Sequence, residues 1–545
     1  MRARDLEIPM GKRTPKYRFF EMLPAFLSYG LLLVPVVLSL IDPFIATVFI
    51  IAYVIFWFVK AIGIAYRTIQ GYNLLQQAQR VDWLGRLNDL EDPEASMIAY
   101  SERASHKGEW RHTTHYRNMQ MVAADQANYQ KPSEVINAVI VPMVKEGRDV
   151  LEPTIESILR SHYNFKSNMI LVIAYEGRAG ESAEELAKSL ITKYGDKFLW
   201  AAAVMHPAGL PNELVGKGGN INCAARELQK YLEEQKIDPD KVIVTTLDAD
   251  NRPDPSYFAY VAYEYIIAGS RRRHLAFQPI SLYMNNIWDV PAAMRVLAVG
   301  NSFWTIINSQ RQHMLRNFSS HSQGMGSLLD TNFWSARTIV EDGHQYWRSY
   351  FAYDGDYDVV PVYVPIYQDA VLSDTYWGTI KAQFVQLRRW AYGASDIAYV
   401  AEKGLGKGSI VPRWGFWARF LRLIDSHVSW ATASIIIAFG AWAPLFLNRE
   451  SSHSIVAHQL PLIASQLQQV ALVGLFITVF LTFKMLPPRP ARYKAHRNLA
   501  MLLQWLIMPI TSIGYGSAAA FNSQTRLLLG KYLDKFDVTE KAVKK

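Results

Sequence analysis

Cysteine is almost absent from this sequence, in which Cys223 is the only one among 545 residues. A single thiol excludes a disulfide framework within the chain and a metal site built from several thiolates. The sequence also lacks the Gly-x-Gly-x-x-Gly fingerprint, the phosphate-loop signature and the His-Glu-x-x-His motif. It therefore carries no signal of a dinucleotide-dependent oxidoreductase, a phosphate-loop NTPase or a zinc protease.

Acidic residues are fewer than basic ones, with 48 Asp and Glu against 57 Lys and Arg and a net charge of +9. Such an excess suits nucleic acid, anionic lipid or anionic substrates as partners. Many basic residues stand beside apolar runs, as the first ones do: Arg2, Arg4, Lys12, Arg13, Lys16 and Arg18. This arrangement is typical of a cytoplasmic membrane flank and not of an RNA-binding stripe. We expect a lipid bilayer as a partner, and no nucleic acid.

Two apolar runs near the start of the chain, Met22–Ile41 and Pro43–Tyr66, are predicted to span a membrane. Each has the ~20 residues that a crossing needs. The first run is long for a signal peptide and is followed at once by the second, so we expect it to be retained. Basic residues before the first run, and Arg67 after the second, place both outer ends in the cytoplasm.

Long apolar runs occur again after Trp390. Arg413–Ile424 is amphipathic and rich in Trp, Phe and Arg, which predicts an interfacial helix. Three apolar runs follow it: Val428–Leu447, Leu467–Leu486 and Leu499–Phe521. The basic loop Pro487–Asn498 should be cytoplasmic. Five spans starting inside would put the basic tail outside, so the last run is either a span, a re-entrant segment or an interfacial one.

The middle of the chain alternates apolar β-branched runs with amphipathic stretches. The expected strands are Val135–Met143, Met169–Tyr175, Phe198–Val204 and Lys241–Leu247, and the expected helices are Val150–Ser161, Ser182–Tyr194 and Asn220–Glu234. This alternation predicts a parallel sheet covered on both faces. Ligands bind such sheets at the carboxyl ends of the strands.

Five regions follow from these patterns. They are an N-terminal tail with two transmembrane helices (1–66), a linker or accessory region (67–134), a cytoplasmic catalytic domain (135–400), an interfacial helix with C-terminal transmembrane helices (401–530) and a basic tail (531–545).

The run Val242–Asp250 is the strongest indication of a functional site. It places Asp248 and Asp250 at the end of an expected buried strand. A spacing of two puts both carboxylates on one side of an extended chain. Such a pair can hold Mg²⁺ or Mn²⁺ while diphosphate oxygens complete the coordination shell. The alternative is a solvated loop after a strand, which is common for a bare Asp-x-Asp.

The segment Leu247-Asp248-Ala249-Asp250-Asn251 resembles the central motif of family 2 glycosyltransferases, in particular membrane-integral cellulose, chitin and hyaluronan synthases. The resemblance implies a Rossmann-like α/β domain of the GT-A type flanked by transmembrane α-helices. It also implies that Asp248 contacts the nucleotide and that Asp250, with Asp248, holds the metal.

Further segments match the donor side of that family in the same order. Pro142 and Glu146 lie in a segment similar to the opening strand and loop that receive the nucleotide. Glu176 stands where the family has an aspartate after the second strand. Lys217 and Asn220 belong to a segment similar to the family's Lys-x-Gly-Asn motif. Alone, that last segment fits a glycine turn before a capped helix equally well.

The run Val340-Glu341-Asp342 resembles the family's Thr-Glu-Asp motif, with valine in place of threonine. The resemblance implies that Asp342 is the general base that deprotonates the acceptor hydroxyl, with Glu341 beside it. An exposed acidic turn is the alternative. Asp369 is a competing base, but Asp342 has the more family-like spacing to the next motif.

Gln386-Leu387-Arg388-Arg389-Trp390 matches the family's Gln-x-x-Arg-Trp motif. Arg389 can bind diphosphate through charge-assisted hydrogen bonds, and Trp390 offers a flat apolar face to a sugar. We expect Gln386 and Trp390 to bind the acceptor, together with Gly324 in a segment similar to the family's acceptor loop. An amphipathic helix approaching the membrane would have a similar composition.

Together these patterns predict an inverting hexosyltransferase with Mg²⁺ or Mn²⁺ as cofactor. The expected donor is a nucleotide-diphosphate sugar, UDP-linked, and the expected acceptor is a growing polysaccharide exported across the plasma membrane. Single-sugar transfer to a lipid acceptor is the nearest alternative. A non-catalytic nucleotide-binding sensor is a second, and a transporter is a poorly supported third, because the spans lack buried charges and paired repeats. The sugar, linkage and oligomeric state are not predicted.

Overall fold

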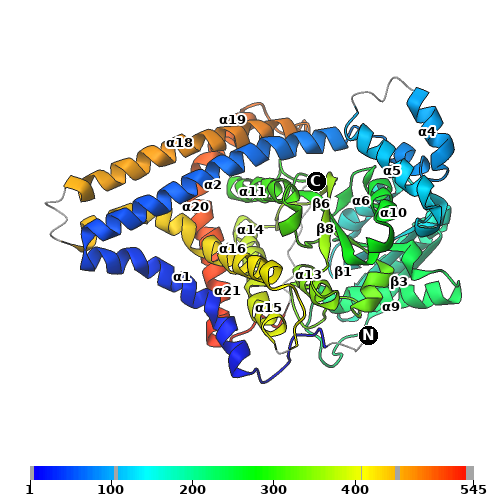
Figure 1. Cartoon of the computed structure of the whole chain (residues 1–545), viewed down its shortest axis with the longest axis horizontal. Helices are drawn as coiled ribbons and strands as arrows, with labels where there is room; N and C mark the ends of the chain where they lie inside the picture. The colour runs from blue at the N-terminus through cyan, green and yellow to red at the C-terminus, as the bar shows by residue number, and fades with distance from the viewer. Residues whose placement is uncertain (1–4, 103–108, 407, 449–454, 536–545) are drawn as a thin grey trace.

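The computed structural model describes residues 5–102, 109–406, 408–448 and 455–535 (Figure 1). Its centre is an eight-stranded mixed sheet in the order β3-β2-β1-β4-β7-β6-β8-β5. The strands are β1 Ile136–Met143, β2 Met169–Glu176, β3 Trp200–His206, β4 Val242–Thr246, β5 Arg252–Pro253, β6 Leu275–Leu282, β7 Ser322–Gly324 and β8 Asp358–Tyr367. The first four in sheet order are parallel, as the alternating pattern predicts.

Helices cover both faces of this parallel half. The connecting helices are α6 Arg148–Leu159, α7 Phe165–Asn168, α8 Glu181–Tyr194 and α9 Lys217–Glu234, with α10 Tyr257–Ile267 after β5. In β1, Ile140 packs with Leu228 of α9, whereas its neighbour Val139 packs in the cluster that holds Ile155 of α6. Successive residues of a strand point to opposite faces, so two separate cores form. The predicted fold class, a GT-A-type (Rossmann-like) α/β domain flanked by long apolar helices, is confirmed.

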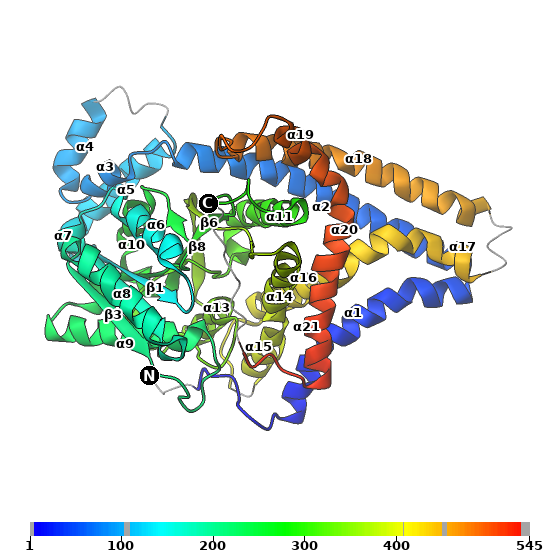
Figure 2. The ribbon, with the colours of Figure 1, turned by 180° about the vertical axis from the view of Figure 1, so that it is seen from behind.

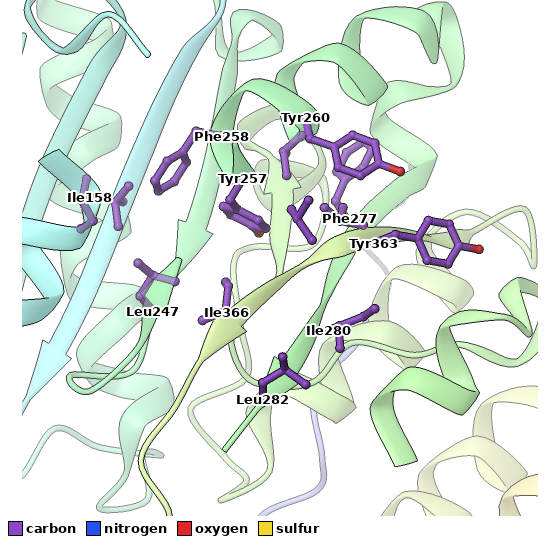
Figure 3. Close-up of a cluster of buried hydrophobic side chains, with 14 of the residues drawn as sticks. Ile158, Leu247, Tyr257, Phe258, Tyr260, Phe277, Ile280, Leu282, Tyr363 and Ile366 are labelled. Atoms are coloured by element: carbon purple, nitrogen blue, oxygen red, sulfur yellow. The ribbon is translucent and has the colours of Figure 1, made fainter. Parts of the chain in front are cut away.

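The other half of the sheet differs from a purely parallel arrangement. The short strand β7 runs antiparallel to both β4 and β6, because the preceding loop enters it beside the end of β4, where His321 accepts the Thr246 N–H at 3.2 Å. Leu247, the residue after β4, points into one buried cluster with Phe277 of β6 and Ile366 of β8 (Figure 3). The remaining helices here are α11 Ala292–Ser309, α12 Met325–Asp330, α13 Glu341–Ala352, α14 Tyr376–Ala391 and α15 Asp396–Gly404.

Residues 67–134, expected to be a linker with some helix or an accessory region, are mostly helical where the structure describes them. They comprise the end of α2 Pro43–Ala78, then α3 Trp83–Asn88, α4 Pro93–Glu102 and α5 His112–Ala124. The Trp83 ring stacks on Tyr260 of α10 with centroids 3.5 Å apart. Buried Trp83 and Leu87 anchor this polar segment, so it forms a layer on the α/β domain.

Among the residues that the structure describes, five segments are long and apolar enough to span a membrane. The helices are α1 Pro15–Ile41, α2, α16 Arg413–Phe439 with α17 Ala443–Leu447, α18 Ile455–Met485, and a last segment of α19 His496–Leu503, α20 Met508–Thr511 and α21 Ala518–Leu529. Arg413–Ile424, expected as a separate interfacial helix, is the first part of α16. No proline or glycine separates it from Val428, so the helix continues.

The last of these segments, residues 496–529, begins and ends beside the α/β domain. Near its start, the Arg295 guanidinium donates to Gln504 Oε1 at 2.5 Å. Just past its end, the Leu533 N–H donates to the Tyr392 hydroxyl at 3.3 Å. Figure 2 shows α20 and α21 running across the direction of α2 and α18. The expected tail at 531–545 is described only as far as residue 535.

Candidate functional site

A pocket opens at the carboxyl ends of β1 and β4, between the sheet and α14. Its walls contain every predicted site residue except Glu176 and Gly324: Pro142, Glu146, Lys217, Asn220, Asp248, Asp250, Glu341, Asp342, Gln386, Arg389 and Trp390. These residues come from segments far apart in the chain. The structure therefore brings together what the sequence shows only as separate motifs.

The two aspartates after β4 have different partners. Asp248 is ion-paired with the Lys217 ammonium, with Oδ1 and Nζ 2.8 Å apart, and its other oxygen accepts the Ser319 hydroxyl. Asp250 is 1% exposed, and its Oδ2 accepts the Asp369 N–H at 2.8 Å. Each carboxylate is thus fixed in the pocket wall by contacts from a different loop.

The donor set suits a hard divalent cation that is shared with a ligand. Among the residues that the structure describes, no group of three or more His, Cys, Asp or Glu side chains could hold a metal ion. Asp248 and Asp250 offer only carboxylate oxygens, which Mg²⁺ and Mn²⁺ accept. An ion here would need oxygens from a diphosphate or water, which is how Mg²⁺ is commonly bound beside phosphates.

Glu341 and Asp342 begin α13 and form an acidic pair beside Lys217. Burial, followed by the charge of Asp342, raises the pKa of Glu341 to about 7. Burial also raises the pKa of Asp342, while Lys217 opposes the rise. The Lys217 ammonium lies 3.8 Å from Glu341 Oε1. A buried carboxyl with a raised pKa is suited to accept a proton near neutral pH.

The opposite wall carries a partly buried cation, Arg389, and two aromatic rings. Burial lowers the pKa of Arg389, whereas Glu341, Asp248 and Asp342 raise it, so this guanidinium faces the acidic groups. The rings of Trp390 and Tyr283 lie 6.1 Å apart. A negatively charged group with an attached ring could fit between these side chains and the carboxylates.

Glu176 and Gly324, the two predicted site residues that do not line the pocket, are buried within the α/β domain. Glu176 is buried, with its Oε2 3.0 Å from the Arg178 guanidinium and 3.3 Å from His206 Nδ1. Arg178, two residues past the end of β2, lines the pocket in its place. Gly324 pairs with Ile243 inside the sheet, and a Cβ atom there would lie 2.9 Å from the Tyr265 hydroxyl oxygen.

Sequence reasoning missed several pocket residues. They are Val144, Arg178, Gly216, Ala249, Tyr283, Ser319, Ile339, Val340, Gln368 and Asp369, of which Val340 and Asp369 were considered only beside Asp342. Arg178 and Tyr283 directly follow strand ends, which is a signal that could have found them. Ser319 lies in an irregular loop whose composition gives no such signal.

Neither a protein-family model nor a curated protein matches this sequence. Solved structures with a similar fold include a mannosyltransferase from Pyrobaculum calidifontis in complex with GDP-Man and Mn²⁺, at 15% identity and a TM-score of 0.40, covering 81% of this chain and 100% of that one. Another is S. aureus TarS 1-349 with UDP-GlcNAc, at 12% identity and a TM-score of 0.31, covering 62% and 92%. GalNAc-T7 with UDP, GalNAc and Mn²⁺ shows 12% identity and a TM-score of 0.30, covering 55% and 60%.

Proposed function

We propose that this protein is a membrane-embedded glycosyltransferase of the family 2 type. It would transfer a hexose with inversion from a nucleotide-diphosphate sugar, UDP-linked, to a growing polysaccharide. The single observation behind this proposal is the convergence of Asp248, Asp250, Asp342 and Arg389 on one pocket. Paired carboxylates, a partly buried base and a partly buried guanidinium suit this chemistry.

On the donor side, Asp248 and Asp250 would hold Mg²⁺ or Mn²⁺ together with the diphosphate. When bound, the ion would supply neutralisation of charge on the leaving diphosphate. Lys217 and Arg389 would donate charge-assisted hydrogen bonds to the same oxygens. Pro142, Glu146 and Asn220 would border the nucleotide, as their places in the pocket wall allow.

On the acceptor side, Asp342 would take the proton from the attacking hydroxyl while that oxygen attacks the anomeric carbon. The bond to the leaving diphosphate breaks on the opposite face, so the configuration inverts. Glu341 would adjust the pKa of Asp342 through the repulsion between their negative charges. Trp390 and Gln386 would hold the acceptor, because they stand on α14, where the pocket approaches the membrane helices.

The arrangement of the last segment supports a topology with four crossings. Gln504 near the start of residues 496–529, and Leu533 just past their end, contact the α/β domain, so this segment would lie along the membrane surface. The Ser523 hydroxyl, on α21, donates to the Arg388 carbonyl of α14 at 2.6 Å. The α/β domain and the end of α21 would then share the cytoplasmic side of the plasma membrane.

A donor screen on membranes containing the full chain tests this function. We expect transfer from one nucleotide-diphosphate hexose with Mg²⁺ or Mn²⁺, loss of transfer in excess chelator, and a product of high molecular mass on size separation. One discrete glycolipid would replace polymer synthesis with single-sugar transfer. Binding of nucleotide by folded protein without transfer or donor hydrolysis would instead favour the sensor. For variants that replace a pocket aspartate with asparagine, the matched control is Asp196→Asn, which changes an exposed aspartate outside the pocket.

A further inference from the structure

Three arginines from separate elements meet where the membrane helices join the α/β domain. Arg67 lies on α2, directly after the apolar run 43–66. Arg311 follows the end of α11, and Arg422 lies on the third turn of α16. None of them lines the pocket described above.

Two side-chain contacts fix the relative positions of these elements. The Gln310 side chain donates to the Arg67 carbonyl at 2.6 Å, which places Arg311 beside α2. The Lys60 ammonium pairs with Asp425 at 3.7 Å and so joins α2 to α16. From that pair, Arg67 is two turns further along α2 and Arg422 is one turn back along α16. Because α2 and α16 run in opposite directions here, both steps lead toward the α/β domain (Figure 1).

The three positive charges act on one another. Burial lowers the pKa of the Arg311 guanidinium, and the nearby charges of Arg67 and Arg422 lower it further. In the described parts of the chain, none of the three forms an ion pair with a carboxylate, and the nearby Asp425 is paired with Lys60. The Asp425 carboxylate also acts on Arg422, so this single negative charge is shared between Lys60 and Arg422. One carboxylate cannot neutralise every positive charge in the group, and like charges held close together cost free energy, which a bound anion would reduce.

The surroundings of the cluster suit an anion that carries an apolar tail. Tyr66, beside Arg67, is 60% exposed, and Trp304 of α11 is 47% exposed. Tyrosine and tryptophan are enriched at the level of lipid headgroups. The side chain of Arg422 is exposed, and those of Arg67 and Arg311 are partly exposed, so a headgroup could reach all three.

We propose that Arg67, Arg311 and Arg422 form a binding site for the phosphate of an anionic membrane lipid, in the leaflet nearest the α/β domain. Arginine binds phosphate through paired N–H donors, and basic pockets between transmembrane helices bind lipid headgroups. A free phosphate carries the same charge but lacks the acyl chains that the exposed aromatic rings would contact. The site does not depend on the proposed transferase activity, so its occupancy can be measured without turnover.

Native mass spectrometry of the purified full chain in neutral detergent tests this site. The probes are phosphatidylglycerol, phosphatidylcholine and inorganic phosphate, each added alone. We expect phosphatidylglycerol to remain bound in preference to the other two. In the triple variant Arg67→Gln, Arg311→Gln, Arg422→Gln, the affinity for phosphatidylglycerol should fall by roughly fivefold for each arginine, the ratio that ~1 kcal/mol per basic residue gives.

The matched control is Arg413→Gln, which removes an exposed positive charge from the same helix. It should bind phosphatidylglycerol as the unmodified chain does. Equal losses in the control and the triple variant would show general surface charge and overturn the proposal, as would unchanged binding in the triple variant. Equal retention of inorganic phosphate would overturn the lipid assignment. If the triple variant does not fold, Arg311→Gln alone decides, because it relieves repulsion between like charges.

Discussion

On the donor side of the pocket, Asp248 and Asp250 directly follow a strand in the interior of the sheet, whereas on the membrane side Arg389 and Trp390 stand on α14. The first pair is held by the sheet and by Lys217, Ser319 and neighbouring backbone. The second pair depends on a helix that packs against the membrane-side segment α21. One pocket therefore combines a part fixed by the α/β core with a part fixed by its contact with the long apolar helices.

The position of α21 beside the α/β domain gives a prediction with two possible outcomes, labelling from one side of the membrane or from the other. In a Cys223→Ser chain, Lys531→Cys and Arg489→Cys should be labelled by an impermeant maleimide from the same side of sealed vesicles. Both positions lie next to contacts with the α/β domain, so they cannot be separated by the bilayer. Asn448→Cys, beyond α17 and bonded to Ser39, should be labelled from the opposite side. If Lys531→Cys were labelled only from the side that labels Asn448→Cys, the last segment would cross the bilayer. That result would contradict its position along the membrane surface.

Asp342→Asn should cause the largest loss of activity, about a thousandfold in kcat, which is within the usual contribution of a general base. The amide keeps the size of the side chain but cannot accept the proton. Asp369→Asn is the matched comparison, because Asp369 lines the same pocket and holds Asp250 through its backbone N–H. Initial rates at saturating donor distinguish them, and a larger loss in the Asp369 variant would reverse the assignment of the base.

The pH dependence should also reflect this buried acidic pair. Burial raises the pKa of Asp342 and raises that of Glu341 to about 7. Since the base must be ionised, kcat should fall by up to tenfold per pH unit below the apparent pKa of the pair. Glu341→Gln should shift this limb to lower pH, because one neighbouring negative charge is gone. An identical profile in the variant would show that the two carboxyls do not interact.

Stability should change with pH in the opposite sense to activity. A carboxyl with a raised pKa in the folded state binds its proton more tightly there than in the unfolded state. Protonated Glu341 therefore stabilises the fold fully below its usual pKa of 4.5, and this contribution is lost as the pH rises through about 7. The unfolding temperature of Glu341→Gln, compared with the unmodified chain at pH 5 and pH 8, measures this difference.

Local patterns predicted the donor side well because its chemistry follows local strand ends. A buried strand before Asp248 is enough to place both aspartates at the edge of the sheet. The position of α19–α21 could not be predicted, because hydropathy does not distinguish a helix that crosses a bilayer from one that lies against a domain. That difference depends on contacts such as Arg295 with Gln504, which are 209 residues apart. Likewise, the burial of Glu176 depends on His206, which comes from a neighbouring strand.

Arg178 lines the pocket wall where the sequence predicted Glu176. Substitution of Arg178 should have the smallest effect on activity, and it concerns the donor side of the pocket. The Arg178 guanidinium donates to Glu176, which also contacts His206, and the arginine lines the pocket. Arg178→Ala should raise the donor KM about tenfold, the ratio expected for a lost charge-assisted hydrogen bond, with kcat nearly unchanged. Arg160→Ala, at an exposed position after α6, should leave both constants unchanged. An equal fall in kcat without a change in KM would show that Arg178 supports the reacting groups instead of the bound nucleotide.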